Sequence, residues 1–189
     1  MDSVSQITLV NQPVLNDWQR ENLIQINEEN IFIYVSEEHQ FPLQSIQRAA
    51  RNIKKMGVKF AKLVGDLWLD DTQWAFALGF TCVDNLTSVE FTGNESSINA
   101  LNDKLAVFAW SRDLTNQTPT QLPPERLAKS AIDYITAQSP AYVSAKVISG
   151  EELEQQGWVG IYNVGKGSIH PPCLLELDFN PSRDENTPV

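Results

Sequence analysis

The order of strand-like and helix-like patterns in the first half of the chain limits its fold more than any other feature. Runs rich in β-branched and aromatic residues, which are typical of strands, occur at 6–10, 23–27, 31–35, 58–64 and 87–93. Apolar residues recur every three or four positions over 43–56, and the segment 72–80 is apolar nearly all round, so both predict helices. A helix that joins two strands of one sheet makes them parallel. We therefore predict a small α/β domain with a mixed sheet over residues 1–93.

Several local signals place the ends of these elements. Only Glu28-Glu29-Asn30 separates the 23–27 and 31–35 runs, which predicts a hairpin. Pro42 suits the first turn of the first helix, and Gly57 suits the left-handed residue that ends it. Asp70, followed three residues later by Gln73, predicts a capping box for the second helix. Because that helix carries small residues among its apolar ones, we expect it to be buried and closely packed on a neighbour.

The character of the chain changes at Asn94. A long helix is predicted to extend to about Leu114, with an inward stripe formed by Ile98, Leu101, Leu105 and Phe108. Its opposite side is also apolar, so we expect the helix to be covered on both sides. A helix that connects two domains has this character, and we assign 94–117 to it.

The remaining residues, 118–189, predict the start of a second α/β domain. A helix is expected over 125–137, with Leu127, Ala128, Ala131, Ile132 and Ile135 facing inward. Strands follow at 141–149 and 173–179, and the S-x-x-E pattern from Ser149 predicts a cap for a short acidic helix that ends at Gly157. This part is too small for a complete α/β domain, so we expect the chain to be a piece of a longer protein.

The charge balance excludes some classes of partner. The chain has 14 Lys and Arg against 24 Asp and Glu, a formal net charge of -10. Such a surface repels nucleic-acid phosphates and anionic lipids. No apolar stretch approaches the roughly 20 residues that span a bilayer, and the N-terminal residues do not resemble a signal peptide. We expect no nucleic-acid partner, no membrane contact and a cytoplasmic location.

One pattern suggests a phosphate-binding loop. Residues 160–166 read G-x-x-x-x-G-K, but Gly167 stands where the hydroxyl residue of such a loop would bind Mg²⁺. A working loop follows a buried strand and opens a helix, whereas the residues before Gly157 are polar and helical, and Pro171-Pro172 follow. We interpret the stretch as a glycine-rich turn that leads into the strand at Cys173.

Residues with metal-binding or nucleophilic chemistry are few and scattered. The only histidines are His39 and His170, and the only cysteines are Cys82 and Cys173, none at ligand spacing. His170 and Cys173 are three residues apart, but two prolines separate them, which disfavours a catalytic pair. The acidic pairs at 70–71 and 151–152 lie at predicted helix starts, where carboxylates are favourable without any catalytic role. The residues alone predict no active site.

Two stretches, taken together, carry a resemblance. Residues 110–131, WSRDLTNQTPTQLPPERLAKSA, and residues 157–181, GWVGIYNVGKGSIHPPCLLELDFNP, occur in this order. They resemble R-D-L-x-N-x-P-x-x-x-L-x-P-x-x-L-A and G-x-G-x-x-x-V-G-x-G-S-x-x-P-P-x-L-L-x-L-x-Y-N-P, two segments of the catalytic domain of the leucine aminopeptidase family. Residues 43–80 look like the N-terminal domain of a bacterial cytosolic branch of that family.

The resemblance implies the N-terminal portion of a metallo-aminopeptidase. The family has an N-terminal α/β domain, a connecting helix and a catalytic domain, in which two divalent ions, Mn²⁺ or Zn²⁺, activate the water that attacks the first peptide bond. Peptide substrates and a homo-oligomer, a hexamer, are implied for the full-length enzyme.

The resemblance assigns none of the family's functional residues to this chain. The metal ligands begin with a V-G-K-G-x-x-F-D-S-G-G stretch, which would follow residue 189, and Lys166 is not its lysine. We therefore expect no catalytic, cofactor-binding or metal-binding residue on this chain, no bound cofactor and no activity of its own. The alternative is a stand-alone, non-catalytic α/β interaction or assembly module.

Overall fold

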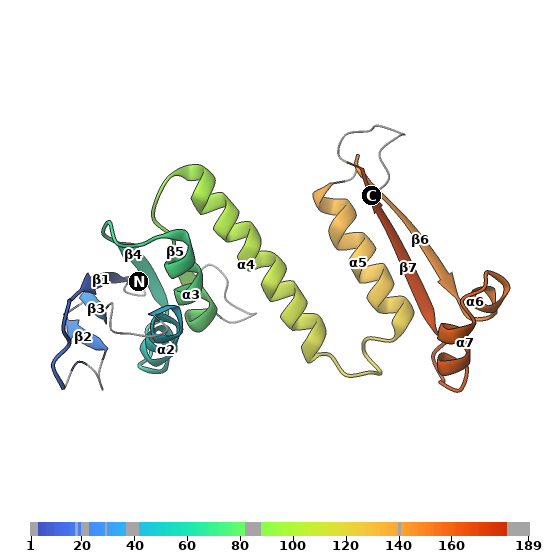
Figure 1. Ribbon diagram of the computed structural model, residues 1–189, viewed down its shortest axis with the longest axis horizontal. Helices are drawn as coiled ribbons and strands as arrows, with labels where there is room; N and C mark the ends of the chain where they lie inside the picture. Colours follow the sequence, from blue (N-terminus) through green and yellow to red (C-terminus); the bar gives the residue numbers. More distant parts are fainter. Residues whose placement is uncertain are drawn as a thin grey trace. The chain divides into compact units, whose positions relative to one another are not determined.

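The computed structural model of the chain describes residues 4–17, 19, 23–28, 30–36, 42–81, 88–139 and 141–180. The chain forms two compact units, a first over Met1–Asp113 and a second over Leu114–Val189. Figure 1 shows the helices and strands of each unit along the sequence. No helix in the described ranges is long and apolar enough to cross a membrane.

The first unit contains a five-stranded mixed sheet in the order β2-β3-β1-β4-β5. The strands are β1 (Val4–Asn11), β2 (Ile24–Asn27), β3 (Asn30–Val35), β4 (Phe60–Val64) and β5 (Val89–Glu90). Strand β2 pairs antiparallel with β3, which confirms the predicted hairpin. The pairs β1–β3, β1–β4 and β4–β5 are parallel. The predicted α/β class with a mixed sheet is therefore confirmed, although β5 is shorter than the expected run at 87–93, whose first residue lies outside the described ranges.

Helices α2 (Pro42–Lys55) and α3 (Asp70–Phe80) connect the parallel strands and share one core with the sheet. They pack very closely, because a β-carbon built on Gly79 would lie 2.2 Å from the backbone oxygen of Gln47. This contact confirms the expectation that the second helix packs tightly on a neighbour. Gly57 follows α2 with a φ of 94°, as the sequence predicts.

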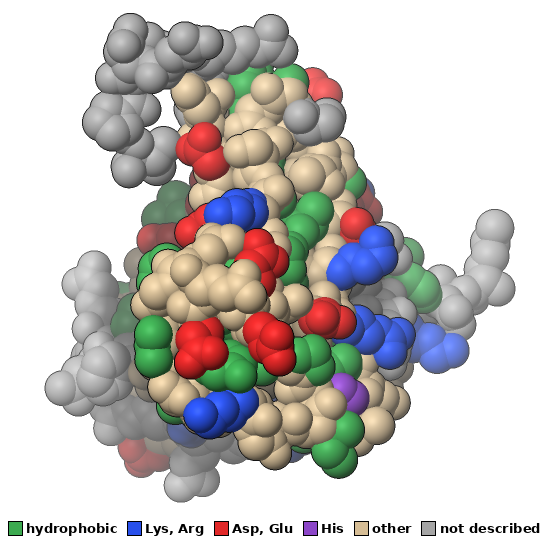
Figure 2. All heavy atoms as spheres, turned by 90° about the vertical axis from the view of Figure 1, so that its right-hand side faces the viewer, with side chains coloured by type: hydrophobic (Ala, Val, Ile, Leu, Met, Phe, Trp, Pro, Cys, Tyr) green, Lys and Arg blue, Asp and Glu red, His purple; other side chains and the backbone are tan. Residues whose placement is uncertain are grey.

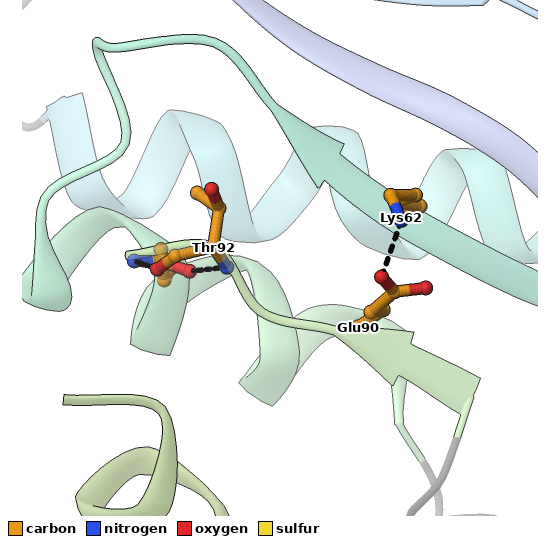
Figure 3. A network of polar contacts seen from close by, with 4 residues as sticks. Lys62, Glu90 and Thr92 are labelled. Atoms are coloured by element: carbon orange, nitrogen blue, oxygen red, sulfur yellow. Dashed lines mark hydrogen bonds and ion pairs between the residues drawn. The ribbon is translucent and has the colours of Figure 1, made fainter. Parts of the chain in front are cut away.

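The start of α3 differs from the predicted capping box. The cap residue is Leu69, whose N–H donates to Oγ1 of Thr72 at 2.9 Å. Gln73 is only 1% exposed and serves another purpose. Its Nε2 donates to the Thr92 carbonyl at 2.9 Å, and its Oε1 accepts from the Thr92 N–H at 2.8 Å. Gln73 therefore acts like a short piece of strand for the segment that follows β5, as Figure 3 shows at Thr92.

Helix α4 (Glu95–Asn116) has a narrower buried stripe than predicted. Leu101, Leu105 and Ala109 are buried, whereas Phe108 is 39% exposed. The expectation that both sides are covered is also wrong, since Val107 is 49% exposed. Ala109 replaces Phe108 in the stripe because it follows Leu105 by one helical turn, while the Phe108 ring lies edge-on against Trp74 at 5.6 Å between centroids.

The second unit contains α5 (Pro124–Gln138), β6 (Val143–Ser149), α6 (Glu151–Gln155), α7 (Val159–Gly165) and β7 (Cys173–Phe179). Strands β6 and β7 form a two-stranded antiparallel sheet. The predicted helix at 125–137 is confirmed, but Leu127 is 44% exposed instead of inward. Ser149 does not cap α6, because it is paired with Cys173 in the sheet. The cap position is occupied by Gly150, which has a φ of 57°.

Candidate functional site

The glycine-rich stretch before β7 is the part of the chain whose sequence most suggested a binding site. Gly157 ends the preceding turn at a φ of 87°. The Trp158 N–H then donates to the Leu153 carbonyl at 2.7 Å, which holds the start of α7 against the end of α6. Most of the G-x-x-x-x-G-K pattern lies inside α7, so the predicted glycine turn is wrong for residues 159–165.

Two backbone N–H groups of this stretch are already engaged, including that of the lysine in the G-x-x-x-x-G-K pattern. The N–H of Tyr162 donates to Trp158 and the N–H of Lys166 donates to Tyr162, at 3.1 and 2.8 Å. The Lys166 ammonium donates to Asn163 Oδ1 at 2.7 Å and lies 5.5 Å from the Tyr162 ring centroid. A phosphate loop needs free N–H groups at a helix start, so this geometry argues against a nucleotide site at 160–167.

One glycine of the stretch permits a close approach. A β-carbon on Gly165 would lie 2.4 Å from Cβ of Pro172. The return from α7 to β7 is tightened further by the Ser168 N–H, which donates to the Gly165 carbonyl at 2.9 Å, and by the His170 N–H, which donates to Ser168 Oγ at 3.2 Å. Gly165 therefore allows helix and loop to pack together, whereas Gly160 and Gly167 have open space around them.

A pocket of about 530 Å³ lies between the start of α5, α7 and this loop. It is lined by Pro124, Gly160, Ile161, Val164, Gly165, Ser168, His170, Pro172 and Cys173. The structure thus brings His170 and Cys173 to one pocket. Burial raises the pKa of the Cys173 thiol, and the Glu125 carboxylate raises it further. A nucleophilic cysteine needs the opposite shift, because the thiolate is the reactive form.

Acidic side chains do not gather into a ligand set in the described ranges. Asp70 lies at the start of α3 and accepts a hydrogen bond from the Ser97 hydroxyl. Glu151 and Glu152 lie in the first turn of α6, where Glu152 accepts from the Gln156 amide at 2.7 Å. Among the described residues there is no group of three or more His, Cys, Asp or Glu side chains that could hold a metal ion. These residues therefore do not fit a two-metal centre. His39 and Cys82 lie outside the described ranges.

The sequence matches two family models, one for each part of the chain. Residues 6–95 match a model described as a peptidase, and residues 109–189 match the catalytic domain of the cytosol aminopeptidase family. Over 98% of the chain, the sequence is 39% identical to Peptidase B of Yersinia pestis (strain Pestoides F) and of Yersinia pseudotuberculosis (serotype O:1b). Residues 109–189 thus resemble the catalytic domain of the cytosol aminopeptidase family. The chain spans 43% of the length of these curated relatives.

Solved structures with the same fold include a maturation enzyme and two leucine aminopeptidases. The bottromycin maturation enzyme BotP in complex with Mn has a TM-score of 0.68 at 17% identity and covers 96% of this chain and 46% of its own. Leucyl aminopeptidase from Trypanosoma cruzi has a TM-score of 0.64 at 16% identity, and the match covers 95% of this chain and 45% of the solved chain. A tomato leucine aminopeptidase mutant has a TM-score of 0.67 at 12% identity, and the match covers 95% of this chain and 49% of the solved chain. At these identities the likeness establishes the fold alone, and each covered share is again under half of the solved chain.

The expected resemblance to the leucine aminopeptidase family and its bacterial branch is therefore confirmed. The expectation that residues 1–189 supply no catalytic, cofactor-binding or metal-binding side chain remains a prediction. One sequence pattern does indicate that residues 159–165 are helical, although the glycines suggested a turn. Val159, Tyr162 and Lys166 follow one another at steps of three and four, which is the spacing of a helix face.

Proposed function

We propose that this chain is part of an aminopeptidase of the Peptidase B type, which removes N-terminal residues from peptides. The observation that carries the proposal is the 39% identity to Peptidase B over 98% of the chain. Because that identity runs through both matched regions, it supports the whole arrangement of an N-terminal part followed by a catalytic-domain part. The domain assignment that we propose is 1–93 for the N-terminal domain, 94–117 for the connecting helix and 118–189 for the start of the catalytic domain.

The proposed reaction uses two divalent metal ions, Mn²⁺ or Zn²⁺, which would activate water and stabilise the developing charge on the peptide carbonyl. The likeness to a solved enzyme in complex with Mn supports manganese as the first choice. We place the metal ligands and the catalytic residues in the part of the enzyme that residues 1–189 do not span. The described residues contribute architecture: they build the N-terminal α/β core and the first strands and helices of the catalytic domain.

The proposed setting is a hexamer in the cytoplasm. The resemblance to a family described as cytosol aminopeptidases supports the location. The net charge of -10 agrees with a protein that avoids nucleic acid and anionic lipid surfaces.

An aminopeptidase assay on two polypeptides tests the proposal. The 189-residue chain and the product of the longest reading frame that contains it are each incubated with leucyl-p-nitroanilide, with added Mn²⁺, with added Zn²⁺ and with a chelator. The longer product should release nitroaniline in a metal-dependent manner, and the 189-residue chain should not. Turnover by the shorter chain alone would contradict the placement of the catalytic residues. An inactive longer product would favour the stand-alone interaction module.

A further inference from the structure

The two units differ greatly in how much hydrophobic side chain they bury. Of the 24 buried hydrophobic residues in the described ranges, only Ala128, Ile148 and Leu153 belong to the second unit. The first unit holds the rest, most of them in one core around the sheet. Conformational entropy opposes folding at every residue, and small units offset it only by burying apolar surface. The second unit therefore has much less apolar burial than the first with which to offset this entropy.

Most of the exposed large apolar residues of the second unit fall into two groups. The first group, named the α7 patch by its position in and next to α7, consists of Trp158, Val159, Val164 and Ile169, of which Val164 is 89% exposed and Ile169 is 97% exposed. Val159 and Val164 are five residues apart, so they lie on different sides of the helix. Of these residues, Val164 lines the pocket of about 530 Å³. Figure 2 views the molecule from the right-hand side of Figure 1, and hydrophobic side chains lie among charged ones on that face.

The second group, the strand patch, lies on one face of the β6–β7 sheet. It consists of Val147, Leu177 and Phe179, each at least 40% exposed. Leu177 pairs with Ala145, two residues from Val147, so these side chains point to the same side of the sheet. Within the described ranges this sheet has only two strands, and each strand pairs on one side alone. A two-stranded sheet is marginally stable in water, and the outer edges of β6 and β7 are open to a further strand.

We propose that the α7 patch and the strand patch dock the remainder of the cytosol aminopeptidase catalytic domain, and that the second unit folds stably only when this polypeptide covers it. The proposal rests on the proposed function. Two observations identify the occupant. Residues 109–189 match a catalytic-domain model, and the chain spans only 43% of the curated relatives. The occupant must supply an added strand for the sheet and apolar side chains for the α7 patch.

A second copy of this chain fits the same surface less well. The acidic side chains of Glu151, Glu152 and Glu154 lie in α6, which immediately precedes Trp158 of the α7 patch. A self-complementary contact would place the same surface on both copies, and it would bring these acidic helices together in a chain of net charge -10. Like charges that meet without partners disfavour such a contact.

The first test is hydrogen exchange of the 189-residue chain alone. The amides of β6 and β7 should exchange on the order of 100-fold faster than those of β1 and β3, because the second unit opens without unfolding the first. Equal protection in the two sheets would overturn the proposal, since it would mean that the second unit is stable without an occupant.

The second test is assembly with the named occupant. The chain is co-expressed with the portion of Yersinia pestis Peptidase B that it does not span, and the product is analysed by size-exclusion chromatography with light scattering. A one-to-one complex is expected, with new exchange protection in β6 and β7 and none in β1 and β3. Failure to form this complex contradicts the proposal. A dimer of the chain alone that gives the same protection would instead assign the surface to a second copy.

Variants show whether the proposed surface makes the contact. The double variant Val164→Lys and Ile169→Lys should weaken the complex by roughly tenfold or more, without changing the first unit, because both side chains are almost fully exposed. Val107→Lys, at a half-exposed position of α4, is the control and should change affinity by less than about twofold. Equal affinity of the double variant and the parent would contradict the assignment of the α7 patch. A complex that forms but cleaves no leucyl-p-nitroanilide supports docking and counts against the proposed function. If the longer product is active but the two polypeptides form no complex, the proposed function is supported and the docking proposal is contradicted.

Discussion

Replacing Gln73 by methionine should destabilise the first unit more than any change at a neighbouring exposed polar residue. The substitution keeps the length and approximate volume of the side chain but removes both hydrogen bonds to the backbone of Thr92. Each backbone group left without a partner costs about 1–3 kcal/mol. Because Thr92 itself is half-buried, the lower part of that range applies, and we expect a loss of about 2–4 kcal/mol in the free energy of unfolding.

That loss is large against the total stability of a domain, which is about 5–15 kcal/mol. For a unit of this size it corresponds to a decrease in Tm of about 8–16 °C. The assay is urea unfolding of the whole chain, followed by tryptophan fluorescence. Four of the five tryptophans precede Leu114, and Trp68 is buried edge-on against Phe76, so the signal reports mainly on the first unit.

The exposed ion pair between Lys62 and Glu90, which lies near Thr92 in Figure 3, provides the matched control for Gln73→Met. Lys62 Nζ lies 2.5 Å from Glu90 Oε1, but the two side chains are 45% and 60% exposed (Figure 3). Exposed pairs contribute between zero and about 1 kcal/mol, so Lys62→Met should cost less than about 1 kcal/mol. If Gln73→Met cost no more than Lys62→Met, the argument that Gln73 substitutes for a strand would be refuted.

A second substitution at the same position adds a pH-dependent test. In Gln73→Glu, burial raises the pKa of the introduced carboxyl, and its protonated form can still donate to the Thr92 carbonyl. A folded-state pKa above the unfolded value makes stability greatest at low pH and lost as the pH rises through the folded value. The variant should therefore approach the parent in acid and fall below Gln73→Met in alkali. Urea midpoints that do not change with pH, relative to the parent, would count against the burial of this group.

Further substitutions probe close packing, a buried indole and the cysteine. Gly79→Ala should cost about 1–3 kcal/mol or more, because the new methyl group overlaps helix backbone; a urea midpoint equal to that of the parent would refute this. Trp68→Phe removes the buried indole hydrogen bond to the carbonyl of Ile7 and should cost about 1–3 kcal/mol, measured by circular dichroism because the substitution removes a fluorescent side chain. Cys173 should react slowly with iodoacetamide at neutral pH, because burial and the Glu125 carboxylate raise its pKa, and Glu125→Gln should accelerate the reaction. Peptide mass mapping distinguishes this cysteine from Cys82. An unchanged reaction rate in Glu125→Gln would contradict the charge effect.

The sequence predicted the first unit well because its signals are local and agree with one another. The hairpin of β2 and β3 and the helix that ends at Gly57 depend on side-chain alternation, helical spacing and one left-handed glycine. The capping box at Asp70 was wrong because Gln73 is engaged by Thr92, nineteen positions later, and local spacing carries no information about such a partner. The short hydroxyl of Thr72 then serves the helix start in its place.

The second unit and its glycine-rich stretch were harder to predict. Glycines at 160, 165 and 167 suggested a turn, yet Gly165 is required by the approach of Pro172, and residues 159–165 remain helical. The outward position of Leu127 has a related cause, since the unit has few neighbours against which to bury it. The family followed from fixed positions spread over residues 110–181, which periodicity alone does not reveal. Local patterns report the elements, whereas close approaches depend on residues brought from elsewhere in the chain.

The contact between Gly79 and the Gln47 carbonyl also governs how the first unit fluctuates. Where the backbones of α2 and α3 touch, no layer of flexible side chains can absorb a displacement of one helix alone. Moving α2 away would uncover the rings of Phe76 and Phe80 together with Ile46 and Ile53, all of which share one core. The two helices, although separated in sequence by β4, should therefore open as a single cooperative segment and show the same slowest rates of amide exchange.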